Sequence, residues 1–234
     1  MLNAEEKSLL IPFSEITLPS YPKPLFEYAN YVISVTGDLC IGVKNWHPYK
    51  GKNAVKCSLI AMFLRASKNL NHLFIDEVFC TKLIFERHVY LYENTTITSL
   101  VLILSPEVSE AFKSKAMDGL VKVLYKNSTL ISLNLVSFWV GTERTKTLLE
   151  ILSKNTVLKS LRLRNFLFHY EEGNMTAKLL CENATLTSLC IRGEDEFTQR
   201  YISPEIASEN GKALANALCK NNTLKNLDLQ FNWE

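Results

Sequence analysis

The chain has 234 residues, of which 47% are hydrophobic and 21% are charged, and its formal net charge at pH 7 is +2. This composition excludes a globally disordered chain and is that of a folded globular protein. The charge is too small to indicate nucleic acid or an anionic membrane as a partner, and no run of about 18 apolar residues predicts a membrane-spanning helix.

The N-terminal segment, residues 1–35, contains no repeat and holds four of the seven prolines of the chain: Pro12, Pro19, Pro22 and Pro24. We interpret it as an N-terminal cap over the first apolar face of a repeat domain that spans residues 36–234. Glu5 and Glu6 precede a short apolar run, whereas a secretory signal peptide has a basic start and a longer apolar segment. The sequence therefore predicts an intracellular, cytoplasmic protein.

A ten-residue phrase, such as KNSTLISLNL at 126–135, recurs in the repeat domain and reduces to the nine-residue pattern N-x-x-L-x-x-L-x-L. Its first apolar position, which we call the anchor, is occupied in the five clear copies by Ile97, Leu130, Leu158, Leu186 and Leu224. A sixth copy has the anchor Leu70, with Ser67 in place of the asparagine, and a degenerate seventh begins at Thr36 with Leu39 and Ile41 in its strand. Successive anchors from Leu70 are 27, 33, 28, 28 and 38 residues apart. The chain therefore has six to seven units of about 28 residues.

Each unit predicts one strand and one helix. The apolar positions three and five residues after the anchor alternate with polar ones, which indicates a short strand with one buried face. Between phrases, apolar residues three and four apart indicate a helix. Alternating helices and strands predict an α/β fold with parallel strands in one sheet. Because one unit buries too little apolar surface to offset the entropy of ordering its backbone, the units must stack into a solenoid.

An asparagine follows each of the five predicted helices before the clear copies, at Asn94, Asn127, Asn155, Asn183 and Asn221. Asparagine tolerates the left-handed backbone conformation, so we expect it to stop the helix in that conformation. Four of these asparagines begin N-x-[ST] sequons, as Asn174 also does. Because the repeat itself produces the sequons, they are poor evidence for glycosylation.

The repeat resembles the leucine-rich-repeat family, ribonuclease-inhibitor type, because it has the pattern LxxLxL, a unit of about 28 residues and a predicted helix in each unit. The resemblance implies a horseshoe or arc, with parallel strands on the concave face and helices on the convex face, and a protein that acts by binding. The family usually has Asn or Cys eight residues after the anchor, where this chain has Val78, Ser105, Phe138, Phe166, Glu194 and Asn232. Only the last of these matches, so we expect irregular turns after the strands.

The sequence offers little chemistry for an enzyme. The four histidines show no HxxxH or HExxH spacing, and neither a phosphate-binding loop nor a nucleophile elbow occurs. The six cysteines form no CxxC pair, and we expect them to be free and buried: Cys40, Cys57, Cys80, Cys181, Cys190 and Cys219. We predict no catalytic residue, no metal and no cofactor. A Cys–His pair assembled from loops is the enzyme alternative that stays open.

Strand alternation places the residues two, four and six after each anchor on the concave side. The first column is small or polar: His72, Ser99, Ser132, Ser160, Ser188 and Asn226. In the other two columns an apolar group adjoins a basic group, and we predict that a partner binds there: Phe74, Val101, Ile103, Val136, Arg162, Arg164 and Arg192. Exposed apolar surface beside arginine is typical of a protein-binding hot spot. In the alternative, the cap or an insertion at 103–113 covers the apolar group.

The two long units carry their extra residues after the strand, in residues 105–115 and 193–210. Insertions at equivalent points collect on one rim of a solenoid. The second insertion holds acidic residues with Phe197 and Tyr201, and is either a ligand contact or a tolerated surface loop.

These features predict a module that binds another protein through the concave face and one rim, without membrane contact. The Lys- and Asn-rich repeat looks similar to repeat proteins that intracellular bacteria deliver into host cells, so a bacterial effector acting on host proteins in the host cytosol is one hypothesis. A sensor or autoinhibitory segment of a larger signalling protein is an alternative. RNA binding through the three arginines is another, disfavoured because the strands carry no aromatic ladder beyond Phe74.

Overall fold

The computed structural model describes residues 2–8, 10–11, 28–46, 51–76, 91, 94–104, 108–137, 140–165, 170–193 and 204–230. They form one seven-stranded sheet in which every strand is parallel to its neighbours and the strands follow one another in chain order. Helices alternate with the strands, so the predicted α/β fold with a single parallel sheet is confirmed. No helix in the described ranges is long and apolar enough to cross a membrane.

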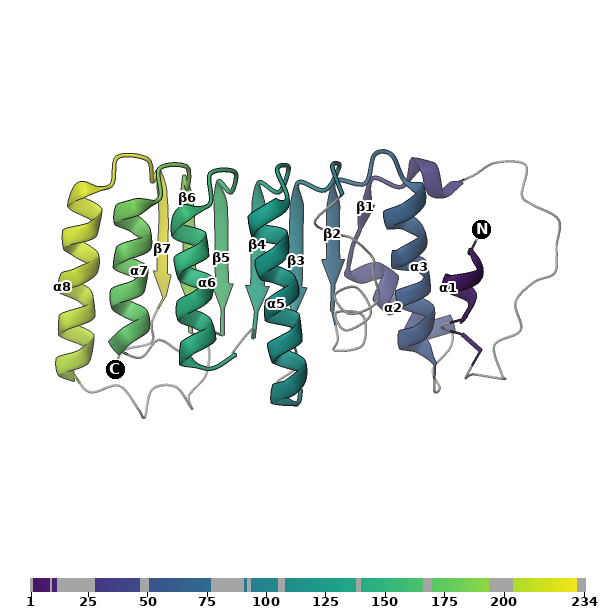
Figure 1. The fold of residues 1–234 in the computed structure, drawn as a ribbon, viewed down its shortest axis with the longest axis horizontal. Helices are drawn as coiled ribbons and strands as arrows, with labels where there is room; N and C mark the ends of the chain where they lie inside the picture. The colour runs from purple at the N-terminus through teal and green to yellow at the C-terminus, as the bar shows by residue number, and fades with distance from the viewer. Residues whose placement is uncertain are drawn as a thin grey trace.

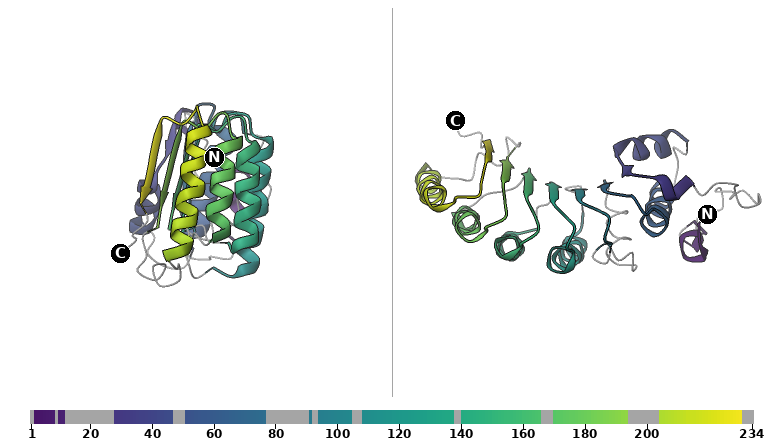
Figure 2. Two further views of the ribbon diagram at one scale, coloured as in Figure 1. Left: turned by 90° about the vertical axis from the view of Figure 1, so that its left-hand side faces the viewer. Right: turned by 90° about the horizontal axis from the view of Figure 1, so that it is seen from above.

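The strands are β1 (Ser34–Val35), β2 (His72–Ile75), β3 (Ser99–Ile103), β4 (Ser132–Val136), β5 (Ser160–Arg164), β6 (Ser188–Arg192) and β7 (Asn226–Gln230). The helices are α1 (Ala4–Ser8), the short 3-10 helix η1 (Tyr28–Tyr31), α2 (Gly37–Trp46), α3 (Lys52–Ala66), α5 (Glu110–Lys126), α6 (Thr142–Lys154), α7 (Tyr170–Glu182) and α8 (Pro204–Lys220). In Figure 1, α5, α6, α7 and α8 stand side by side in front of the sheet. Seen from above, the strands line the inner side of a shallow arc and these helices line the outer side (Figure 2).

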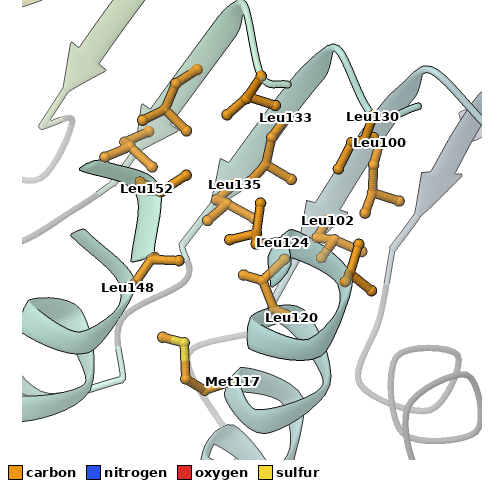
Figure 3. Close-up of a cluster of buried hydrophobic side chains, with 14 of the residues drawn as sticks. Leu100, Leu102, Met117, Leu120, Leu124, Leu130, Leu133, Leu135, Leu148 and Leu152 are labelled. Atoms are coloured by element: carbon orange, nitrogen blue, oxygen red, sulfur yellow. The ribbon is translucent and has the colours of Figure 1, made fainter. Parts of the chain in front are cut away.

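The core lies between the strands and the outer helices. The strand leucines pair in one register, with Leu133 aligned to Leu100 and to Leu161 and each at most 1% exposed. Figure 3 shows the leucines of β3 and β4 meeting those of α5 and α6, among them Leu120 and Leu148. A single apolar cluster runs from Val35 in β1 to Ala217 in α8. The units therefore share one core, as expected for a solenoid.

The asparagine after each helix works differently from the sequence prediction. Asn127 and Asn155 have φ angles of −76° and −72° with extended ψ, so the prediction of a left-handed residue is wrong at both. The Oδ1 atom of Asn127 instead accepts hydrogen bonds from the backbone N–H groups of Thr129 and Leu130, at 2.9 and 2.8 Å. Its Nδ2 donates to the carbonyl of Asn94, one unit earlier, at 2.8 Å. The asparagine thus ends its helix and joins two units at once.

The degenerate seventh unit is also placed differently. Val35 of β1 pairs with Leu73 of β2, so Val32 takes the anchor position and the sheet begins inside the segment expected to be the cap. The prediction of a strand at Leu39 and Ile41 is wrong, because both residues lie in α2. The hydroxyl of Thr36 accepts the N–H of Asp38 at 3.3 Å, which is the bond of a helix N-cap rather than of a strand.

The two insertions are partly helical. α5 and α8 have 17 residues each, whereas α6 and α7 have 13, a difference of four residues or about one turn. Residues 110–115 and 204–210 are therefore helix, so the surface-loop alternative for the second insertion does not hold for residues 204–210. Phe197 and Tyr201 lie outside the described residues.

The strands β4 and β5 end in the same way. Ser137 and Asn165, each seven residues after its anchor, have positive φ angles of 54° and 52°. The N–H of Ser137 donates to the carbonyl of Arg164 in the next unit, at 2.9 Å. These two turns begin alike. The positions where the family has Asn or Cys all lie outside the described residues: Val78, Ser105, Phe138, Phe166, Glu194 and Asn232.

Candidate binding surface

The register of the sheet aligns the residues that face away from the outer helices into rows. The middle row contains Phe74, Val101, Asn134, Arg162, Cys190 and Asp228, in neighbouring positions on β2 to β7. The next row contains Ile103, Val136, Arg164, Arg192 and Gln230, on β3 to β7. All seven residues predicted as partner-binding therefore lie together, on the inner face of five adjacent strands. We call this surface the strand face.

The apolar part of the strand face is half-buried, and a helix covers one end of it. Val101, Ile103 and Val136 are each partly exposed. α2 lies on the inner side of the sheet, opposite the other helices (Figure 2). A methyl group added at Gly37 would lie 3.6 Å from the ring of Phe74, so α2 begins against that ring. The N-terminal region thus packs over Phe74, while the other three apolar residues are partly open to solvent.

A polar contact holds α2 in this position. Asp76, just after β2, accepts a hydrogen bond from the Cys40 thiol of α2. The same carboxylate lies 3.5 Å from the ammonium of Lys56 in α3, whose side chain is only 2% exposed. A buried ammonium is costly without a charged partner. Asp76 therefore links the helix inside the arc to a helix outside it.

The basic part of the strand face contains one paired and two unpaired arginines. The Nη2 and Nε atoms of Arg192 donate to Asp228 at 2.6 and 3.1 Å. This hydrogen bond lowers the pKa of the Asp228 carboxyl, and Arg162 adds a smaller electrostatic effect. Within the described residues, Arg162 and Arg164 make neither a hydrogen bond nor an ion pair. The uncompensated positive charge therefore sits on β5, in the middle of the face.

Two buried polar atoms on this face also lack a partner within the described part of the chain. The Nε atom of Arg164 is a donor without an acceptor, and the Oδ1 atom of Asn134 is an acceptor without a donor. Asn134 pairs in register with Arg162 on the neighbouring strand. Buried polar atoms in folded proteins nearly always have hydrogen-bond partners. These two atoms therefore mark a place where a bound molecule can supply the missing groups.

Asn134 and Asp228 lie four residues after the anchors Leu130 and Leu224, so strand alternation predicts both on the concave side but gives neither a role. The sequence signal for Asp228 is its diagonal position relative to Arg192, because side chains on neighbouring strands interact at such positions. For Asn134, no signal in the sequence distinguishes an unsatisfied amide from a solvated one.

The cysteines and histidines of the described residues do not assemble a reactive site. Burial, followed by the charge of Asp228, raises the pKa of the Cys190 thiol, which donates to that carboxylate at 3.6 Å. The remaining free cysteines are buried at Cys40 and Cys57 and exposed at Cys181 and Cys219, so the prediction of burial is wrong for these last two. No group of three metal-binding side chains occurs within the described ranges. Cys80, His47, His88 and His169 lie outside them.

Comparison with known proteins finds neither a family model nor a curated protein that matches the chain. The strand face is therefore interpreted from its own residues.

Proposed function

We propose that the chain is a leucine-rich-repeat protein of the ribonuclease-inhibitor-like type, and that it binds a partner protein through the strand face and one adjoining rim. The sequential parallel strands, the helices that precede β4, β5, β6 and β7, and the asparagine bonds between units support the family assignment. The proposed activity is binding alone, with no catalytic residue and no cofactor.

The observation that carries this proposal is the unpaired state of Arg162 and Arg164. Arg192, on the neighbouring strand, has a carboxylate partner, whereas these two arginines have none among the described residues. They adjoin Val136 and the apolar residues of β3 in the same rows. Arginine next to apolar side chains at the centre of a surface is the composition of an interface core, where a partner's acceptors satisfy the guanidinium groups.

The size of the strand face supports a contribution from the rim. The six strands β2 to β7, about 4.8 Å apart and about 17 Å long, form a face of about 500 Å². A standard protein interface takes about 800 Å² from each partner. A stable complex therefore needs contacts beyond the sheet, which the turns at either edge of the strands can supply.

A capture experiment tests the proposal. Immobilised wild-type chain is compared with Arg162→Glu/Arg164→Glu in quantitative mass spectrometry of bound proteins. Lys122→Glu/Lys212→Glu is the matched control, since it makes the same charge change at exposed positions of the outer helices α5 and α8. We expect a specific protein that the wild type and the control retain and the arginine variant loses. The same captured set for all three proteins would contradict the proposal.

A further inference from the structure

Resting on the proposed function, we infer that the partner contributes an extended acidic segment in which an apolar residue and an aspartate or glutamate stand two positions apart. The carboxylate binds between Arg162 and Arg164. The apolar side chain packs on Val101, Ile103 and Val136. The backbone of the segment supplies the donor that Asn134 lacks.

The charges of the strand face favour a negatively charged group on the partner. Asp228, the carboxylate of the strand face, already pairs with Arg192. Asp76, just after β2, already pairs with Lys56. Arg162 and Arg164 lie two residues apart on β5, so their side chains leave the sheet on the same side, about 7 Å apart at the backbone. A carboxylate between them can accept from both guanidinium groups, and charge-assisted hydrogen bonds of this kind are stronger than those between neutral groups.

The two atoms without hydrogen-bond partners favour a peptide as the bound group. The Nε of Arg164 needs an acceptor and the Oδ1 of Asn134 needs a donor, on neighbouring strands. A peptide segment offers both, because each residue carries a backbone N–H and a carbonyl. The phosphates of a nucleic acid offer acceptors alone, so the donor for Asn134 would have to come from a base or a ribose 2′-hydroxyl. A peptide backbone matches the pair of atoms by itself.

The distance between the apolar and basic parts selects the spacing. The midpoint between β3 and β4, where Val101, Ile103 and Val136 lie, is about 7 Å from β5, since parallel strands are about 4.8 Å apart. In an extended segment, residues two apart are about 7 Å from one another and point to the same side. A segment crossing the strands therefore places one residue of such a pair on the apolar part and the other on the arginines. Residues adjacent in sequence would point to opposite sides.

Synthetic peptides test this inference on the whole chain. The probes are acetyl-GSLTEGS-amide, its reversed form GSETLGS, the adjacent-residue form GSLETGS, the uncharged form GSLTQGS, and a form with phosphoserine in place of glutamate. Binding is measured by titration with amide NMR, which also reports the strands affected. We expect GSLTEGS or GSETLGS to shift the signals of β4 and β5 saturably. Binding is expected to be at least ten-fold weaker for GSLTQGS and about five-fold weaker for GSLETGS.

Two variants locate the contact. Arg162→Gln/Arg164→Gln is expected to weaken binding of the glutamate peptide at least ten-fold, while Lys122→Glu/Lys212→Glu leaves it unchanged. The inference would be overturned if GSLTEGS and GSLTQGS bound equally, or if the phosphoserine peptide bound more tightly than the glutamate peptide. It would also be overturned if Arg162→Gln/Arg164→Gln left the binding of the glutamate peptide unchanged. Failure of every peptide to bind would overturn it as well.

The outcomes separate this inference from the proposed function. If an arginine-dependent partner is captured and no peptide binds, the partner chemistry is wrong and the proposed function stands. If the glutamate peptide binds and no captured protein depends on the arginines, the partner chemistry stands and the proposed function is wrong. Circular dichroism of each variant confirms that the variant is folded.

Discussion

The Nδ2 atom of Asn183 lies 2.9 Å from the backbone carbonyl oxygen of Asn155, the residue at the same position one unit earlier. It also donates to the carbonyl of Leu152, at 2.8 Å, while its Oδ1 accepts the N–H of Leu186 at 2.7 Å. One side chain thus satisfies backbone groups of two units. This asparagine ladder fixes how each unit sits on the one before it, and so fixes the rows of the strand face.

Replacement of Asn183 by alanine is expected to lower the free energy of unfolding by about 2–4 kcal/mol, because it leaves buried backbone donors and acceptors unpaired at about 1–3 kcal/mol each. Urea unfolding measures the change. Asn174→Ala is the control: Asn174 is exposed on α7, and its replacement is expected to change the free energy by less than about 0.5 kcal/mol. Equal effects of the two substitutions would contradict the ladder.

Gly173 of α7 packs closely against α8. A methyl group at this position would overlap the side-chain amide of Asn210, which is buried. Gly173→Ala is therefore expected to destabilise the chain by about 1–3 kcal/mol through overpacking. The double variant Gly173→Ala/Asn210→Ala is expected to recover part of this loss, measured as the coupling free energy of a double-mutant cycle.

Gly211→Ala is the matched control for that substitution. Gly211 lies in α8, and an added methyl group would meet nothing within 4 Å. Alanine is favoured over glycine inside a helix by about 1 kcal/mol, so this variant is expected to be slightly more stable than the wild type. If Gly211→Ala lowered the free energy of unfolding and Gly173→Ala left it unchanged, the assignment of close packing to Gly173 would be contradicted.

The pairing of Arg192 with Asp228 predicts a dependence of stability on pH. Because the folded-state pKa of Asp228 is lowered, its contribution is present above the unfolded value of about 3.9 and is lost as the pH falls through the folded pKa. The stability difference between wild type and Asp228→Asn should therefore be largest near neutral pH and shrink in acid. Urea midpoints of both proteins between about pH 7 and pH 3 measure it. A constant difference would show that the carboxylate contributes nothing through its charge.

The unpaired arginines are expected to serve binding rather than folding. Arg164→Leu removes a buried donor that has no acceptor, so it is expected to leave the free energy of unfolding unchanged or to raise it by up to about 1 kcal/mol. Leu163→Ala at the neighbouring core position is the contrast, because Leu163 is fully buried and its loss is expected to cost about 2–5 kcal/mol. Thermal and urea unfolding decide whether Arg164 instead supports the fold.

The strand rows could be predicted from the sequence because two features of the repeat determine them. Alternation within a strand sets which side chains share a face, and an equal number of residues after the anchor sets which residues become neighbours, as for Val136 and Arg164. Extra residues between phrases do not disturb this register, since they are accommodated outside the strand. For that reason the seven predicted binding residues lie together.

The remaining features depend on contacts that the period does not encode. An asparagine after a helix can adopt a left-handed conformation or bond through its amide, and both end the helix, so the sequence does not separate them. β1 has only two residues, too few for alternation to identify Val35, whereas the spacing of Leu39 and Ile41 imitates a strand. The position of α2 over Phe74 is a tertiary contact with no local signal.

Arginine labelling offers the most direct test of the central claim that the strand face binds a partner. Phenylglyoxal is applied to the free chain and to its complex with a captured protein, and modification is quantified at Arg162 and at Arg144, a control on the outer helix α6. Arg162 is expected to react in the free chain and to be protected in the complex, whereas Arg144 is expected to react equally in both. Protection of Arg144 while Arg162 reacts equally in both states would place the partner on the outer helices and contradict the account.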